Sequence, residues 1–205
     1  MTDAYGMADP ADCQKDIDSA GGESWRTRPA LNRAVLEAVE LAHSAGWDSP
    51  PQLVALVPTE LLAGALGREL DDDPLSLVVQ EPLPEGVEGG SPELGEFIAR
   101  TSWPEGVVGA VLVQEVLVVA PDRAGEIDDM ELEEVRASAR DGLARQARLI
   151  TGVLDEGPDL TLIQPRPTEA ELAERGPFAD DDIELRDGSG TADGVVAALR
   201  ATFGG

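Results

Sequence analysis

The chain has 205 residues and a formal net charge of −26 at pH 7, from 41 acidic and 15 basic residues. Such a surface repels nucleic acids and anionic membranes, whose phosphates are bound through Lys and Arg, so we expect no nucleic-acid partner. The hydrophobic fraction of 42% is sufficient for a folded core, and Cys13, the only cysteine, excludes an intrachain disulfide.

The N-terminal segment 1–28 shows no hydrophobic periodicity and mixes Asp, Gly, Ser and Pro. We predict a flexible tail there, followed by a single domain over 29–203. The segment also lacks a basic start followed by an apolar run, so no secretory signal is predicted. The expected location is the cytoplasm.

The first half of the domain predicts helices and strands in alternation. Pro29 suits the first turn of a helix, and apolar residues recur at helical spacing up to Gly46, which ends it. The segment 47–51, Trp-Asp-Ser-Pro-Pro, is a rigid connector because both prolines have a fixed φ. A strand over 52–57, a helix over 59–66, an acidic loop over 69–73 and a strand over 75–80 follow.

The second half predicts the centre of the sheet. Ser91 is placed to cap a helix that ends at Trp103-Pro104, and 107–119 is the longest strand. This stretch is interrupted by Gln114 and Glu115 and is shorter than the roughly 20 apolar residues of a membrane span, so no membrane insertion is expected. The remaining predictions are an acidic segment over 121–134, a helix over 130–140, a β-hairpin of 146–154 and 159–163, a long acidic surface loop at 164–190 with a short helix over 168–174, and a final helix over 191–203.

This order of elements predicts an α+β fold. We expect a mixed or mostly antiparallel sheet of about five strands, with helices packed mainly on one face. A doubly wound parallel sheet is the alternative, but a nucleotide-binding sheet of that kind carries a Gly-rich turn after its first strand, and this turn is absent.

Catalytic and metal-binding motifs are few. His43, the only histidine, lies near the end of the first helix with no identified nucleophile as partner, so no catalytic residue and no cofactor is predicted. One Cys and one His cannot form a zinc site. Carboxylate sites for a divalent metal stay open at two acidic runs, Asp71-Asp72-Asp73 and Asp180-Asp181-Asp182.

Two tryptophans at element boundaries are the predicted partner-binding residues. Trp47 with Asp48, and Trp103 with Pro104, both lie where one edge of the indole can stay exposed, and tryptophan is enriched among interface hot spots. The alternative is that both side chains pack at the rim of the core.

Several short motifs resemble an uncharacterised family of acidic actinobacterial proteins. They are Ala-Gly-Trp47-Asp48 with Pro50-Pro51, the run over 53–62, Trp103-Pro104 with the strand that follows, and 148–154. The resemblance implies a bacterial cytoplasmic setting and no established activity. The segment 165–190 is longer and more acidic than this resemblance implies.

The charge and the lack of a catalytic set favour a non-enzymatic binding or adaptor protein for a basic partner protein. The alternative is a carboxylate-based divalent-metal binder or enzyme. Self-association as a homodimer also stays open, although apolar burial must then overcome the repulsion between two subunits of −26 each.

Overall fold

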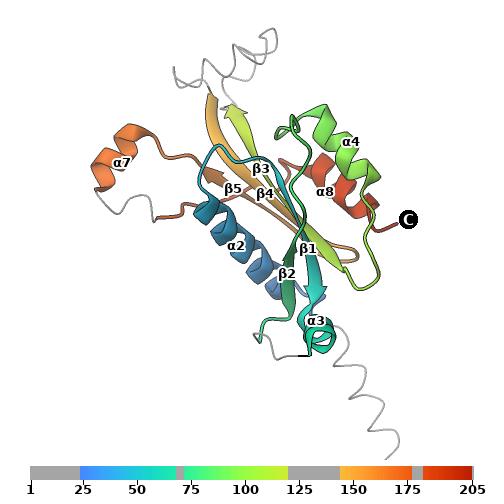
Figure 1. Cartoon of the computed structure of the whole chain (residues 1–205). Coiled ribbons are helices and arrows are strands. Elements are labelled where there is room, and N and C mark those ends of the chain that lie inside the picture. The colour runs from blue at the N-terminus through green and yellow to red at the C-terminus, as the bar shows by residue number, and fades with distance from the viewer. Residues whose placement is uncertain (1–23, 68–71, 120–143, 177–181, 205) are drawn as a thin grey trace, which may run out of the picture.

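The computed structural model describes residues 24–67, 72–119, 144–176 and 182–204 (Figure 1). Most of the predicted N-terminal tail, the acidic segment with its helix over 130–140, and Asp71, Asp180 and Asp181 lie outside these residues. In chain order the elements are α2 (Arg28–Ala45), β1 (Gln52–Pro58), α3 (Thr59–Leu66), β2 (Leu75–Val79), α4 (Pro92–Arg100), β3 (Gly109–Val119), β4 (Ala144–Leu154), β5 (Asp159–Pro165), α7 (Glu169–Arg175), β6 (Arg186–Asp187) and α8 (Asp193–Ala201).

The strands form one antiparallel sheet in the order β2-β1-β3-β4-β5-β6. The α+β class and the antiparallel sheet are therefore confirmed, and so is the hairpin of β4 and β5. The sheet has one strand more than expected. The extra strand is the two-residue β6, which pairs with β5 inside the segment 164–190 that was predicted to be a loop.

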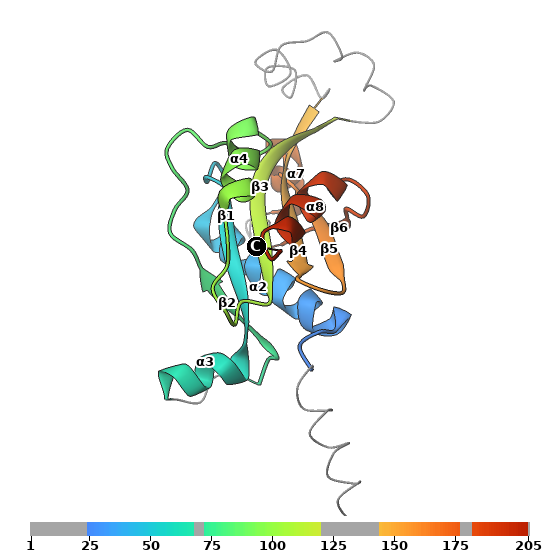
Figure 2. The same cartoon turned by 90° about the vertical axis from the view of Figure 1, so that its right-hand side faces the viewer.

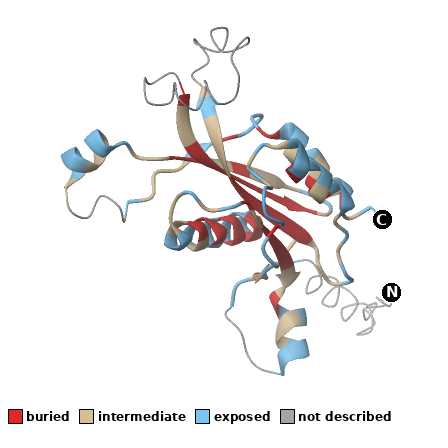
Figure 3. Ribbon diagram, turned by 45° about the horizontal axis from the view of Figure 1, so that its top comes forward, coloured by how far each residue is buried: buried red, intermediate tan, exposed pale blue. Residues whose placement is uncertain are grey.

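Helix α2 covers one face of the sheet. Thr27 caps its first turn by accepting a hydrogen bond from the Ala30 amide, and Gly46 ends it with a φ of 82°, a conformation that glycine adopts without strain. The helix buries a stripe of Leu31, Val35, Val39 and alanines against Val and Leu side chains of the central strands. Figure 3 shows this buried stripe facing the buried strands while the outer side of α2 is exposed.

Helices α4 and α8 cover the opposite face (Figures 1 and 2). There Leu94 and Ile98 of α4 and Leu199 of α8 join Leu112 and Val153 in a second core cluster. The expectation that helices pack mainly on one face is thus wrong. Central strands such as 109–113 are apolar at every position, and a strand of this kind needs cover on both faces.

None of the helices in the described ranges is long and apolar enough to cross a membrane.

Candidate functional site

A polar row crosses the sheet just beyond the end of α2. The strand register places Glu115 of β3 opposite Arg148 of β4, and Arg148 opposite Gln164 of β5. Because side chains alternate along a strand, Arg148 lies on the same face as Ile150, which packs under α2. The row therefore continues the α2 face where the helix no longer covers it.

Arg148 is buried although it is charged. Its side chain is only 2% exposed, and its guanidinium donates hydrogen bonds to the Gln164 amide oxygen at 3.2 Å and to the Gly46 carbonyl oxygen. The Glu115 carboxylate lies 3.5 Å from Nε of Arg148. Burial lowers the pKa of Arg148, while the charge of Glu115 acts in the opposite direction. The arginine thus ties the end of α2 to the sheet.

Glu115 holds the connector that follows α2. Its carboxylate accepts hydrogen bonds from the backbone amides of Asp48 at 3.1 Å and Ser49 at 3.4 Å, and from the Gln146 side chain at 2.7 Å. The Glu115 side chain is only 12% exposed, so these hydrogen bonds replace the contacts with water that its carboxylate loses on burial.

Trp47 and Asp48 lie against two arginines. The guanidinium carbon of Arg148 is 4.1 Å from the centre of the Trp47 ring, and that of Arg166 is 5.4 Å away. Arg166 also donates two parallel hydrogen bonds to the Asp48 carboxylate, at 2.7 and 2.9 Å. This bond lowers the pKa of Asp48 and raises the pKa of Arg166. Asp48 has a φ of 64°, a left-handed conformation that is uncommon for residues other than glycine.

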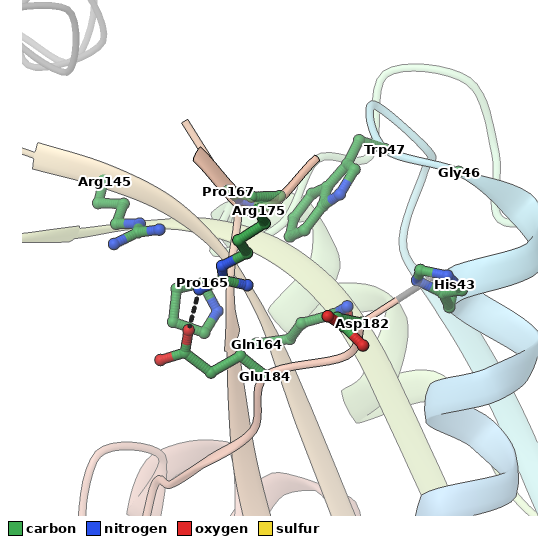
Figure 4. Close-up of a pocket in the computed structure, with 10 residues that line it drawn as sticks. All are labelled: His43, Gly46, Trp47, Arg145, Gln164, Pro165, Pro167, Arg175, Asp182 and Glu184. Atoms are coloured by element: carbon green, nitrogen blue, oxygen red, sulfur yellow. Dashed lines mark hydrogen bonds and ion pairs between the residues drawn. The ribbon is translucent and has the colours of Figure 1, made fainter. Parts of the chain in front are cut away.

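A pocket of about 280 Å³ opens beside Trp47 (Figure 4). His43, Gly46 and Trp47 line it from the end of α2. The rest comes from β4, β5, the connection to α7, α7 itself and the segment before β6: Arg145, Gln164, Pro165, Pro167, Arg175, Asp182 and Glu184. We call this the Trp47 pocket. No Ser, Thr, Cys, Lys or Tyr is among the described residues that line it, so no hydroxyl, thiol or amine nucleophile accompanies His43 there.

A second pocket, of about 360 Å³, borders the later part of the connector. Its walls are mainly apolar, with Pro50, Pro82 and Leu83, and Arg148 also lines it.

An acidic segment includes α4 and the loops on either side of it. Between 81 and 108 the chain has six glutamates and one basic residue, and all six are exposed: Glu81, Glu85, Glu88, Glu93, Glu96 and Glu105. Apolar residues between them, such as Leu83, Leu94 and Ile98, pack into the second core cluster, and Glu81 also lines the second pocket beside Ala42 and Ala45 of α2. We call these six residues the acidic face.

A protein-family model described as PPA1309-like protein matches residues 31–204. The chain belongs to the PPA1309-like family. The match extends from α2 to just beyond α8 and thus includes the connector, the Trp47 pocket and the acidic face. It agrees with the resemblance to an uncharacterised family. No curated protein and no solved structure matches the chain.

In this PPA1309-like chain the predicted partner-binding residues lie at two separate places. Trp47 and Asp48 adjoin the pocket on the α2 side, whereas Trp103 packs in the cluster under α4 and α8. The Trp103 indole stacks on Phe203 at 5.9 Å and donates a hydrogen bond to the Thr202 hydroxyl at 2.7 Å. Pro104 beside it is exposed.

The two acidic runs predicted as possible metal sites, 71–73 and 180–182, lie only partly within the residues that the structure describes. Asp73 pairs with Arg33 at 2.9 Å, Asp72 is exposed, and Asp182 lines the Trp47 pocket. Among the described residues no group of three or more His, Cys, Asp or Glu side chains is placed to hold a metal ion.

Sequence reasoning missed the residues that surround Trp47 in this PPA1309-like protein. The sequence predicts strands at Glu115 and Arg148 and places Gln164 at the start of the surface loop 164–190, whereas the structure has Gln164 in β5. A signal was present, since the alternation of β4 places Arg148 on the buried face together with Ile150. A charged residue at such a position needs a partner, and the register of the neighbouring strands supplies it.

Proposed function

We propose that this chain is a non-enzymatic binding protein whose acidic face holds a basic partner protein. The observation that carries the proposal is the charge of the segment 81–108, where six exposed glutamates accompany a single basic residue, Arg100. Arg100 already pairs with Glu96 at 2.6 Å. The segment therefore carries six carboxylates against one guanidinium group, an excess of negative charge.

Arginines elsewhere in the described chain do little to reduce this charge, because most of them pair with other carboxylates. The pairs are Arg26 with Asp155 and Glu156, Arg33 with Asp73, Arg145 with Glu171, Arg148 with Glu115, Arg166 with Asp48, Arg175 and Arg186 with Glu184, and Arg200 with Asp159. A field of one sign steers partners of the opposite sign and accelerates their association.

Trp103 and Pro104 supply an apolar contact beside the acidic face. The hydrogen bond from the indole to Thr202 fixes the half-buried ring, so little conformational entropy is lost when a partner covers its open part. Carboxylates around a rigid aromatic side chain form a polar rim around an apolar centre, the usual arrangement of a transient interface.

The setting that we propose is the cytoplasm of an actinobacterium. It rests on the acidic composition and on the motifs around Trp47 and Trp103 described above.

Two charge-matched variants test the proposal. In the face variant, Glu85, Glu93 and Glu105 become Gln; in the control variant, Glu40, Glu169 and Glu174, which are also exposed, become Gln. Both changes raise the net charge equally, so they separate the local surface from the total charge.

Binding of a fluorescent oligo-arginine peptide is measured by anisotropy at low and at moderate salt. We expect the face variant to bind at least about fivefold more weakly than the control variant, and wild-type binding to weaken steeply as the Debye length falls below about 10 Å. Equal losses in the two variants would show that only the total charge attracts the peptide, and the proposed face would then be wrong.

A further inference from the structure

The Trp47 pocket differs in charge from the rest of the chain. Five arginines surround it or its immediate supports: Arg145, Arg148, Arg166, Arg175 and Arg186. Their carboxylate partners are Glu171, Glu115, Asp48 and Glu184. In a protein of net charge −26 this neighbourhood is rich in guanidinium groups and nearly balanced in charge, so an anion is repelled less here than elsewhere.

Two of these arginines line the pocket itself. Arg145 donates through Nε to the Arg166 carbonyl oxygen at 3.0 Å and through Nη2 to Glu171 at 2.6 Å. Arg175 donates through Nη2 to Glu184 at 3.0 Å. Glu171 and Glu184 thus orient the two guanidinium groups. Because a guanidinium carries five N–H donors, both groups keep further donors for a ligand. Both side chains are about one-third exposed, which gives a ligand access.

The other walls of the pocket are flat and apolar. Figure 4 shows the Trp47 ring and the rings of Pro165 and Pro167 around the Arg175 side chain. Such surfaces fit a planar group. The pocket of about 280 Å³ is at the small end of the range for ligand sites, which limits the ligand to one ring with a short substituent.

We propose that the Trp47 pocket binds a small planar organic carboxylate. The carboxylate is taken by the donors of Arg175 and Arg145, because the planar fork of a guanidinium matches two carboxylate oxygens. The ring of the ligand lies against Trp47. Asp182 and Glu184 at the pocket disfavour a multiply charged group such as a polyphosphate. This site is independent of the acidic face.

The test uses the full chain labelled with ¹⁵N and two ligands of similar size and shape, the anion benzoate and the neutral benzamide. Two-dimensional NMR follows the Trp47 indole and the arginine Nε resonances at about 0.15 M salt, where the field of distant carboxylates is screened beyond about 8 Å. We expect benzoate to shift the resonances of Trp47, Arg145 and Arg175 in a saturable way and to bind at least about tenfold more tightly than benzamide, as expected for a charge-assisted hydrogen bond.

Arg175→Gln should weaken benzoate binding by about tenfold, whereas Arg100→Gln, which removes an exposed arginine that also has one carboxylate partner, should leave it unchanged. The spectrum of each variant shows directly whether it is folded. Equal affinity for benzoate and benzamide, unchanged binding by Arg175→Gln, or no saturable shift up to about 10 mM, above the millimolar Kd of a weak ligand, would each overturn the proposal.

Discussion

The buried pair of Glu115 and Arg148 allows a sharp test of how the connector is held. Replacing Glu115 with Gln keeps the size of the side chain and removes its negative charge. It also replaces one of two acceptor oxygens with an NH2 group: Oε2 accepts from the Asp48 amide at 3.1 Å, and Oε1 accepts from the Ser49 amide at 3.4 Å. The Arg148 guanidinium, in a side chain that is 2% exposed, then stays buried without a counter-charge.

The size of the effect follows from this burial. Removing one partner of a buried ion pair destabilises a protein by about 3–5 kcal/mol. Arg148 keeps two neutral acceptors, the Gly46 carbonyl and the Gln164 amide oxygen, and it keeps the Trp47 ring at 4.1 Å. Glu115 is itself 12% exposed. We therefore expect the lower end of the range, a loss of about 3 kcal/mol in the free energy of unfolding.

Urea unfolding at neutral pH, followed by far-UV circular dichroism, measures the loss. The single variant Arg148→Met and the double variant Glu115→Gln, Arg148→Met complete the double-mutant cycle, and the double variant removes both charges and fills a similar volume. We expect it to be more stable than Glu115→Gln alone, with a coupling energy of at least about 1.5 kcal/mol between the two sites. A loss below about 1 kcal/mol in the single variant, or additive losses in the double variant, would refute the view that Glu115 neutralises a buried charge.

Three further outcomes follow from the same geometry. Arg166 lowers the pKa of Asp48, so this carboxylate adds stability above its unfolded pKa of about 3.9, and the gain disappears as the pH falls through the lower folded pKa. Between neutral pH and about pH 2 the free energy of unfolding should therefore fall less in Asp48→Asn than in wild type. The difference is at most about 1 kcal/mol because the side chain is exposed. Parallel pH dependences of the two proteins in chemical denaturation would contradict this. Gly152→Ala should destabilise the fold by about 1–3 kcal/mol, because its Cβ would come within 2.4 Å of Val35 under α2. Gly95 of α4 has open space around it, so Gly95→Ala should instead raise the melting temperature, through a gain of about 0.5–1 kcal/mol in the free energy of unfolding. A loss of stability in Gly95→Ala, or no loss in Gly152→Ala, would show that the packing is described wrongly.

Local sequence patterns predicted most of the elements because those elements follow local rules. Ser91 caps α4 through the Leu94 amide at 3.2 Å, as its position before an apolar helix indicated. The hairpin of β4 and β5 follows from two strands around a short turn. Such signals depend on neighbouring residues alone.

The distribution of helices over the two faces was harder to predict. A run such as 109–113 is apolar throughout, and this indicates burial on both faces, but not which helix supplies the cover. Helix α2 covers one face, and the other is covered by α4 and α8, which meet only in the folded chain.

The site around Trp47 depends on contacts between distant residues. Arg166 bonds Asp48 across 118 positions, and Arg148 bonds Gly46 across 102. The sequence singled out Trp47 and Asp48 as a motif, but it contained no local sign of which arginines would reach them. Only the register of β3, β4 and β5 brings these side chains together.

The most direct test of the proposed function captures the natural partner. Tagged wild-type chain, the face variant and the control variant are each used to recover proteins from the lysate of cells that express the chain, at low and at moderate salt. We expect wild type and the control variant to recover the same basic protein at low salt, and the face variant to lose it. Recovery of nothing at either salt, or equal recovery by the face variant, would contradict the proposal that Glu85, Glu93 and Glu105 hold a basic partner.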